Sequence, residues 1–201
     1  MNNNQQILSA RKNRTKKHFM LSFIKLIKEK GYHSVTVKDI VDAAAYNRST
    51  FYIHYQDKEK LADDLLTSML DGLEASVGKA YKPGRKVYTT YLNASHFNII
   101  SYIYRHRDFF ELINIDDTLP GLHLGFPQTI QRIYKNHFIF ETINDLPVNM
   151  DYFTNYTAFG FCGLLKNWVH SDFKVSQEEF IQEVVQLSKT HIYSIRYIGK
   201  E

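Results

Sequence analysis

Cysteine is almost absent from this sequence. Cys162 is the only one among 201 residues, so the chain cannot form an internal disulfide and suits a reducing compartment. The first residues, MNNNQQILSARKNR, lack the apolar core of a secretory signal. The nearest approach to a membrane span, NIISYIY, falls far short of the roughly 20 apolar residues that cross a bilayer. We therefore expect a soluble, cytoplasmic protein with no membrane partner.

Sequence motifs for chemistry are also missing. The nine histidines include no His-x-x-x-His pair, and Cys162 has no second cysteine with which to hold zinc. Neither a glycine-rich phosphate loop nor a nucleophile elbow occurs. We therefore predict no catalytic residue, no metal ligand and no cofactor. Asn-Gly and Asp-Gly hairpin turns between alternating segments are absent too, as are repeats of about 20–50 residues.

Positive charge is concentrated in the first third of the chain. Residues 1–60 carry 12 Lys and Arg against 5 Asp and Glu, whereas residues 61–201 carry 13 against 16. The net charge of +4 therefore hides a basic segment followed by a slightly acidic one. A basic segment of this kind is typical of a protein that meets a polyanion.

Hydrophobic residues recur at helical spacing along nearly the whole chain, which predicts an all-α fold. Gly31 ends the first expected helix, at about 15–30. Thr36, with an acidic residue three positions later, caps the second, VKDIVDAA; Asn47 caps the third; Asp57 caps a fourth that reaches to about Lys79. After the hinge-like linker KPGRK at 82–86, further helices are expected near 87–106, 108–115, 122–143, 151–170 and 177–197, the last with a capping box of Ser176 and Glu179.

The second and third expected helices have the proportions of a helix-turn-helix. In this motif the second of two helices set at a steep angle is able to enter the major groove of DNA. Phe51 and Tyr55 lie four residues apart and should face inward. The exposed side should carry Arg48, Ser49, Thr50 and Tyr52.

The segment GYHSVTVKDIVDAAAYNRSTFYIHYQDKEKL resembles the DNA-binding signature of TetR-family transcriptional regulators. The matching positions are Gly31-Tyr32, Thr36, the run from Thr50 to Tyr55, and the Lys58-Glu59-Lys60-Leu61 run, within about the first 65 residues. The resemblance implies a three-helix head, a connecting helix, and a larger helical body that binds ligands and dimerises. The turn carries Ala45 where such proteins usually have glycine, which bears on the turn and on the angle of the third helix.

The resemblance also implies roles for residues of the head. Some should contact base edges or nearby phosphates and others should bond phosphate oxygens, with the basic arm at about 1–14 disordered in the free protein and lying along the DNA backbone or a minor groove when bound. Lys58, at a helix N-terminus, has independent support as a phosphate ligand. The DNA-binding candidates are Lys38, Asn47, Arg48, Ser49, Thr50, Tyr52, His54 and Lys58. Tyr52 and His54 as surface residues without a DNA contact remain an alternative.

The remaining part of the chain is rich in aromatic residues. They favour a pocket for a small apolar or aromatic ligand, with Tyr91, Tyr102, Phe110, Tyr156 and Trp168 as candidates; the alternative is that they fill a helical core. A stripe of Tyr156, Gly160, Gly163 and Asn167, with a second of Phe180, Val184, Leu187 and His191, predicts a dimer through the last two helices. Burial of both stripes within one subunit is the alternative.

Taken together, these features predict a transcriptional regulator, a homodimer that binds a palindromic double-stranded DNA operator as a ligand-released repressor. Its parts would be a DNA-binding head (1–60), a connecting helix and linker (61–86) and a regulatory and dimerisation body (87–201). An activator or a regulator that answers to a protein partner is the first alternative. A helical enzyme or scaffold is the second.

Overall fold

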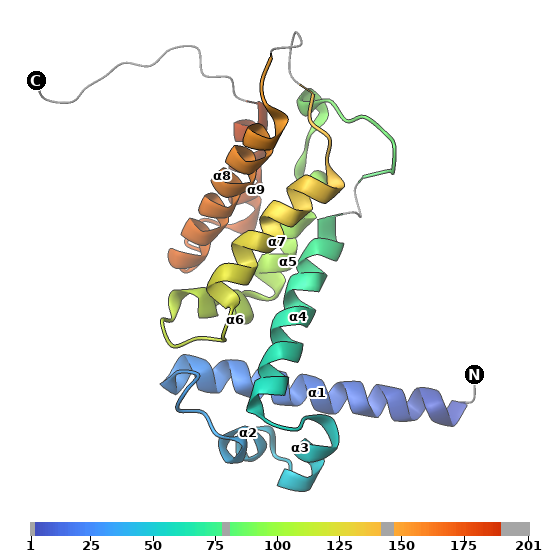
Figure 1. Cartoon of the computed structure of the whole chain (residues 1–201), viewed down its shortest axis with the longest axis vertical. Coiled ribbons are helices and arrows are strands. Elements are labelled where there is room, and N and C mark those ends of the chain that lie inside the picture. Colours follow the sequence, from blue (N-terminus) through green and yellow to red (C-terminus); the bar gives the residue numbers. More distant parts are fainter. Residues whose placement is uncertain (1–2, 78–80, 142–146, 190–201) are drawn as a thin grey trace, which may run out of the picture.

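Every element in the described part of the chain is helical. The computed structural model describes residues 3–77, 81–141 and 147–189, with side chains from Ala10 onward. Within these ranges α-helices and short 3-10 helices occur and strands do not, so the predicted all-α class is confirmed. Figure 1 shows a small head of α1 to α3 at one end and a taller bundle above it, with α4 running between them.

The head is built from α1 (Asn3–Lys30), α2 (Val37–Ala44) and α3 (Arg48–His54). Its core contains Phe19, Phe23 and Ile27 of α1, Ile40 of α2 and Phe51 of α3, all of them fully buried. Burying a large apolar side chain contributes about 1.5–3 kcal/mol. These five side chains therefore account for much of what holds the three helices together.

The first helix is longer than predicted. It begins at Asn3, so the arm expected to be disordered instead continues α1 and projects past the body (Figure 1). The physical reason is local: QQILSARKNR is made mostly of residues that favour helix, and neither Pro nor Gly interrupts the chain before Gly31.

The connecting helix α4 (Lys58–Val77) begins as expected, because Asp57 Oδ1 accepts the Lys60 amide at 2.7 Å. Leu61, Leu65 and Leu73 of α4 are fully buried, and the helix packs against α1 in the head and against α5 and α7 in the body. The predicted end near Lys79 lies outside the described residues. One rigid element thus connects the two parts.

The body departs from the predicted ranges at its start. Two 3-10 helices, η1 (Thr89–Tyr91) and η2 (Ala94–His96), precede α5 (Asn98–Arg105), so the helix predicted from residue 87 was wrong over its first part. Residues 87–91, VYTTY, are β-branched or aromatic and favour helix poorly. The Asn93 side chain then accepts the Ser95 amide and forms a separate turn.

The rest of the body follows the predicted helices more closely. α6 (Arg107–Phe110) continues into η3 (Glu111–Asn114), so the segment expected at 108–115 is divided. α7 (Leu122–His137) ends earlier than expected, while α8 (Met150–His170) and α9 (Gln177–Lys189) begin where predicted. The Ser176–Glu179 capping box is present at the start of α9. The predicted extension of α9 to 197 lies outside the described residues.

A second contact joins the head to the body at the turn after α1. The Tyr32 amide donates to the Asp117 carbonyl at 2.8 Å, and the His33 amide donates to the Asp117 carboxylate. Gly31 has φ 78°, and a Cβ there would lie 2.2 Å from Asp117 Oδ2, so only glycine fits. The hydrogen bond from His33 holds the pKa of Asp117 below its usual value.

Candidate nucleic-acid interface

The turn between α2 and α3 is closed by Ala45 in the left-handed conformation, with φ 57° and ψ 43°. The Ala45 amide bonds to the Asp42 carbonyl and the Tyr46 amide to the Val41 carbonyl, as at an ordinary helix C-terminus. An alanine in this region costs roughly 1–2 kcal/mol that a glycine would not. The departure at Ala45 therefore costs stability but leaves the turn in the conformation that glycine usually provides.

Asn47 starts α3 and organises its first turn. Its Oδ1 accepts three hydrogen bonds, from the Thr50 amide at 2.8 Å and from the hydroxyls of Ser49 and Thr50 at 2.8 and 2.7 Å. Asn47 is thus the predicted cap of the helix. The two hydroxyls, having donated their protons to Asn47, present only acceptor lone pairs to a further partner.

The inner face of α3 is fixed from two sides. Phe51 is fully buried, with its ring 5.3 Å from that of Phe19. The Tyr55 hydroxyl donates to Asp64 of α4 at 2.8 Å, and Lys16 of α1 bonds the same carboxylate oxygen at 2.8 Å. Burial, and then the bond to Asp64, raise the pKa of Tyr55, which stays neutral. Burial opposes the charge of Asp64, but the bonds from Lys16 and Tyr55 hold its pKa below the usual value.

The outer face of α3 is exposed. Arg48, Ser49 and Tyr52 lie on the surface, as predicted, and Tyr52 is 54% exposed. Thr50, predicted on the same side, is only partly exposed. No role was predicted for Ile53. Its side chain is 74% exposed, more than any other large apolar side chain described in the head. A helix fixed on one face and open on the other is the arrangement that docking into the major groove requires.

His54 lies differently from a free surface residue. It is half-buried, its ring packs edge-on against Phe19, and its Nδ1 is buried with no hydrogen-bond partner among the described residues. Burial, followed by the nearby charges of Lys12 and Lys16, lowers the pKa of His54. The side chain is therefore neutral at pH 7 and offers one N–H for bonding.

Lys58 also has contacts within the protein. Its ammonium group donates to the Tyr32 carbonyl at 3.1 Å and lies 4.4 Å from the centre of the Tyr32 ring. The side chain thus holds the turn after α1, which lies 26 residues earlier in the sequence. The same ammonium group also donates to the His33 carbonyl at 3.5 Å. A lysine has three N–H donors, so one donor of Lys58 remains for a phosphate.

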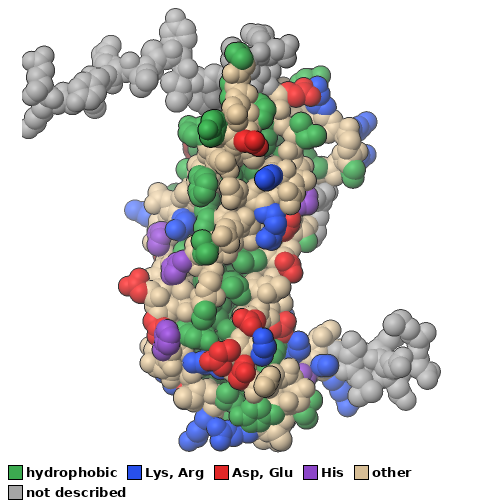
Figure 2. Space-filling model, viewed as in Figure 1, with side chains coloured by type: hydrophobic (Ala, Val, Ile, Leu, Met, Phe, Trp, Pro, Cys, Tyr) green, Lys and Arg blue, Asp and Glu red, His purple; other side chains and the backbone are tan. Residues whose placement is uncertain are grey.

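Basic side chains extend the polar surface of α3. Lys38 of α2 is exposed, and so are Arg11, Lys12, Arg14 and Lys17 along the first half of α1. Figure 2 shows Lys and Arg side chains at the foot of the head, below a band of Asp and Glu at the level of α1. A positive foot with acidic groups above it favours a polyanion at that end of the molecule.

An exposed apolar face runs along α8 at the other end. Tyr152, Tyr156 and Phe159 are 76%, 78% and 58% exposed, at the spacing of one helix face. Gly160 and Gly163 on the same face are exposed, and a Cβ on either would meet nothing within 4 Å. This α8 face, defined by these five residues, is open to close approach by another helix.

Two family matches cover the head and the body. Residues 24–65 match the family described as "Bacterial regulatory proteins, tetR family", and residues 95–190 match "Transcriptional regulator C-terminal region". The chain belongs to the TetR family. Both matched descriptions are those of regulatory proteins.

Relatives of this TetR-family regulator agree with the assignment. An HTH-type transcriptional regulator of Bacillus subtilis (strain 168), YxbF, is 23% identical over 83% of this chain and 42% of its own length. The HTH-type transcriptional repressor KstR2 of Rhodococcus jostii is 40% identical over 24% of each chain. The chain thus spans less than half of the length of either curated relative. A solved TetR regulator of Streptococcus agalactiae is 25% identical with a TM-score of 0.57, over 92% of this chain and 98% of that one.

Of the five residues predicted to bind a ligand in this TetR-family regulator, Tyr102 and Phe110 lie together, with ring centroids 6.2 Å apart, and the other three lie in different surroundings. Tyr91 is 72% exposed, and Tyr156 belongs to the α8 face. Phe110 is fully buried in the core. The hydroxyl of Tyr102 donates to the Met69 carbonyl at 3.1 Å, and Trp168 Nε1 donates to the Val175 carbonyl at 2.8 Å. The polar groups of Tyr102 and Trp168 therefore have hydrogen-bond partners within the protein.

The second stripe predicted for the dimer, on α9, is also placed differently. The Phe180 ring stacks on Trp168 with centroids 4.4 Å apart, and Val184 is buried. Both residues therefore stabilise the subunit itself, while Leu187 is exposed. His191 lies outside the described residues.

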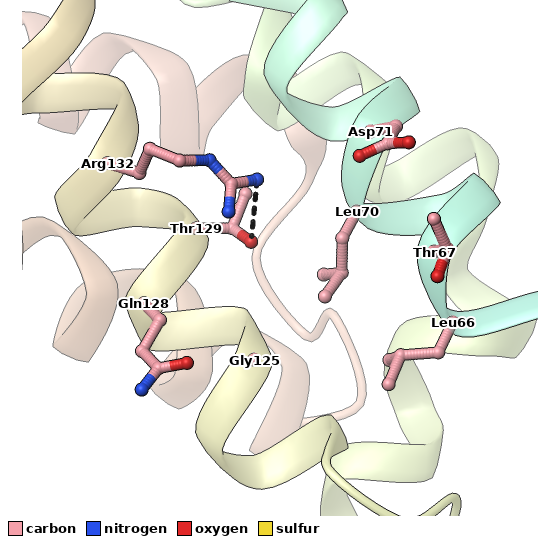
Figure 3. Close-up of a pocket in the computed structure, with 8 residues that line it drawn as sticks. All are labelled: Leu66, Thr67, Leu70, Asp71, Gly125, Gln128, Thr129 and Arg132. Carbon is pink, nitrogen blue, oxygen red and sulfur yellow. Dashed lines mark hydrogen bonds between the residues drawn. The ribbon is translucent and has the colours of Figure 1, made fainter. Parts of the chain in front are cut away.

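A pocket of about 230 Å³ opens between α4 and α7. Figure 3 shows Leu70 pointing into the space between the two helices, with Arg132 across from it. Arg132 bonds to Glu74 at 2.8 Å, which fixes its position at the rim. The lining residues are Leu66, Thr67, Leu70, Asp71, Gly125, Gln128, Thr129 and Arg132. None of the eight was predicted from the sequence, because residues on two separate helices give no local signal of a shared pocket.

Among the described residues, no three His, Cys, Asp or Glu side chains gather in a way that would hold a metal ion. Within the same ranges, no helix is both long enough and apolar enough to cross a bilayer.

Proposed function

We propose that this regulator is a repressor that binds a two-fold symmetric operator as a homodimer and leaves it when a small molecule binds the body. The observation that carries the proposal is α3, whose inner face is fixed by Phe51 and Tyr55 while Arg48 and Tyr52 remain exposed. A curated relative is by name a transcriptional repressor, which supports the sign of regulation.

On DNA, the residues around α3 would have different roles. Arg48, at the start of the helix, is placed to bond guanine, and Thr50 and Ser49 to accept from base amino groups. Tyr52 and Lys58 would bond phosphates, which position the protein and carry little sequence information. The remaining candidates support them: Lys38 and His54 as further phosphate contacts, and Asn47 by holding the hydroxyls of the first turn in place.

The homodimer would form through the α8 face. Three exposed aromatic side chains supply apolar area, and Gly160 and Gly163 let the partner helix come close. A two-fold dimer places two α3 helices on the same side of the assembly. Such an arrangement fits a palindromic operator whose half-sites lie about one helical turn apart.

The effector would act through α4. Leu66 and Leu70 of the α4–α7 pocket belong to the same helix as Asp64, which bonds Tyr55 of α3 at 2.8 Å. A small molecule with an apolar group that separates α4 from α7 would therefore also move α3. Allosteric coupling of this kind is typically about 1–3 kcal/mol.

A second candidate is an activator, or a regulator that answers to a protein partner. It is favoured by the filled core: Phe110 and Trp168, predicted to bind a ligand, are buried among protein side chains instead. The functional division into 1–60, 61–86 and 87–201 applies to both candidates.

Footprinting on the DNA upstream of the gene, with and without candidate small molecules, tests the proposal. We expect one protected region with two symmetric half-sites, lost when an effector is added, and affinity that falls steeply with salt. An effector should also raise the melting temperature of the protein by mass action. Protection that appears only with a second protein would favour the alternative, and salt-insensitive binding or none would overturn both.

A further inference from the structure

Ile53 occupies the centre of the outward face of α3. Successive residues of an α-helix are rotated by about 100°, so Ile53, two positions after Phe51 and two before Tyr55, points away from both of these buried side chains. Phe51 is 0% and Tyr55 5% exposed, whereas Ile53 is 74% exposed. Ser49, one turn earlier, shares this outward direction.

An exposed isoleucine at this place has a cost. Single apolar residues occur on most protein surfaces, but a β-branched side chain in the last turn of a short helix lowers helix propensity and gains little from packing when it is 74% exposed. In free solution a polar residue would serve α3 better. Contact with an apolar group of the bound partner would offset the cost.

Ser49, Thr50 and Ile53 offer no hydrogen-bond donor to a base. The hydroxyls of Ser49 and Thr50 both donate to Asn47 Oδ1, so neither has a proton left for a base. Ile53 can neither donate nor accept. In the major groove the one apolar group on a base edge is the 5-methyl group of thymine.

We infer that Ile53 contacts a thymine methyl group in each operator half-site and selects thymine at that position. The inference rests on the proposed binding of α3 in the major groove and adds the base that its outermost apolar side chain recognises. Phosphate-bonding residues give affinity for any sequence. Ile53 gives a preference at one base pair.

The test uses uracil, which pairs as thymine does and lacks only the methyl group. An operator is first selected from a random-sequence duplex library with the full chain, and each thymine of one half-site is then replaced by uracil. Removing one buried methyl should weaken binding of the wild type about fourfold at one position. The Ile53→Ala homodimer loses the contact in both half-sites, so it should bind the thymine operator about sixteenfold more weakly than the wild type does, which is fourfold for each half-site. The same uracil replacement should cost the variant nothing further.

Leu124→Ala is the matched control. Leu124 is 63% exposed but lies on α7 in the body, so this variant should respond to uracil as the wild type does. Equal sensitivity of the wild type and Ile53→Ala at every thymine, or no sensitivity anywhere, would overturn the inference while leaving sequence-specific binding intact. Failure to select any operator would overturn the proposed function as well.

Discussion

Ala45 ends α2 in a left-handed conformation that its Cβ disfavours, and its side chain is exposed. Lys58 bonds the carbonyls of Tyr32 and His33 and keeps one donor for the phosphate contact proposed above. Both residues affect the internal geometry of the head, which is a requirement separate from DNA binding. Substitutions there should separate the two requirements.

Ala45→Gly should stabilise the protein by about 1 kcal/mol, because glycine adopts the left-handed conformation without strain and no packing is lost. Ala43→Gly, at an exposed position inside α2, is the control and should destabilise by a similar amount. Urea unfolding of both variants checks the prediction. Two changes of the same sign would contradict it.

Arg48→Ala and Lys58→Ala should weaken DNA binding in different ways. Arg48→Ala should cost on the order of 1–3 kcal/mol on the operator and much less on scrambled DNA, because it removes a base contact. Lys58→Ala should weaken binding to both DNAs alike and reduce the log–log salt slope by about one unit per site. It should also lower the melting temperature, since the bonds from Lys58 to the Tyr32 and His33 carbonyls are lost.

Binding curves on operator and scrambled duplexes at several salt concentrations separate these effects. Lys60→Ala, whose ammonium group pairs with Asp63 on the surface, serves as a control for general charge. The same factor lost by Arg48→Ala on both DNAs would show that this side chain does not distinguish bases.

At the level of elements, α3 is held by helices from elsewhere in the chain. Asp64 of α4 accepts hydrogen bonds from Tyr55 of α3 and Lys16 of α1. One carboxylate therefore joins the recognition helix to the other two elements that position it. Its ionisation makes this junction sensitive to pH.

Asp64→Asn should destabilise the protein by about 1 kcal/mol at pH 7, because the Lys16 bond loses its charge. The folded-state pKa of Asp64 lies below its unfolded value. Its contribution is therefore present above the unfolded pKa of about 4 and is lost as pH falls through the folded pKa. The difference between wild type and variant should disappear in acid. Thermal unfolding of wild type and variant from pH 7 to pH 2 measures the difference in stability. Asp63→Asn removes a carboxylate from an exposed ion pair with Lys60 and serves as the nearly neutral control.

At the level of the whole molecule, several contacts join the head to the bundle. They are the helix α4, the bonds from Tyr32 and His33 to Asp117, and the ion pairs of Lys28 of α1 with Asp108 and Glu111. The α8 face lies on the bundle, away from the head (Figure 1). A partner bound there would be able to set the distance between two heads without touching them.

Gly163→Arg should break the dimer. Nothing lies within 4 Å of a Cβ at Gly163 in the subunit, and arginine favours helix more than glycine does, so the monomer should stay folded. Sedimentation at micromolar concentration should give twice the 23.6 kDa chain mass for the wild type and the single chain mass for the variant. The affinity of the variant for a palindromic operator should fall as well, because the dimer is lost. Asn136→Arg, exposed on α7, should remain a dimer; a monomeric wild type would show that the α8 face does not pair.

The local sequence determined the starts of several helices. Asp39 lies three residues after Thr36, Thr50 three after Asn47, and each pair is bonded as predicted. A cap depends only on atoms within one turn, so residue types at fixed spacing suffice to predict it. The same holds for Phe51 and Tyr55, whose four-residue spacing placed them on the buried face.

Only the tertiary structure decided which of several apolar surfaces is covered. Phe180 is stacked on Trp168 while Tyr156 is left exposed, although both were predicted on dimer stripes. Lys58 bonds a carbonyl 26 residues away, and the pocket residues come from two helices some 60 residues apart. Periodicity shows that a helix has an apolar face. It does not show which neighbour buries that face, because that depends on packing among helices that are distant in the sequence.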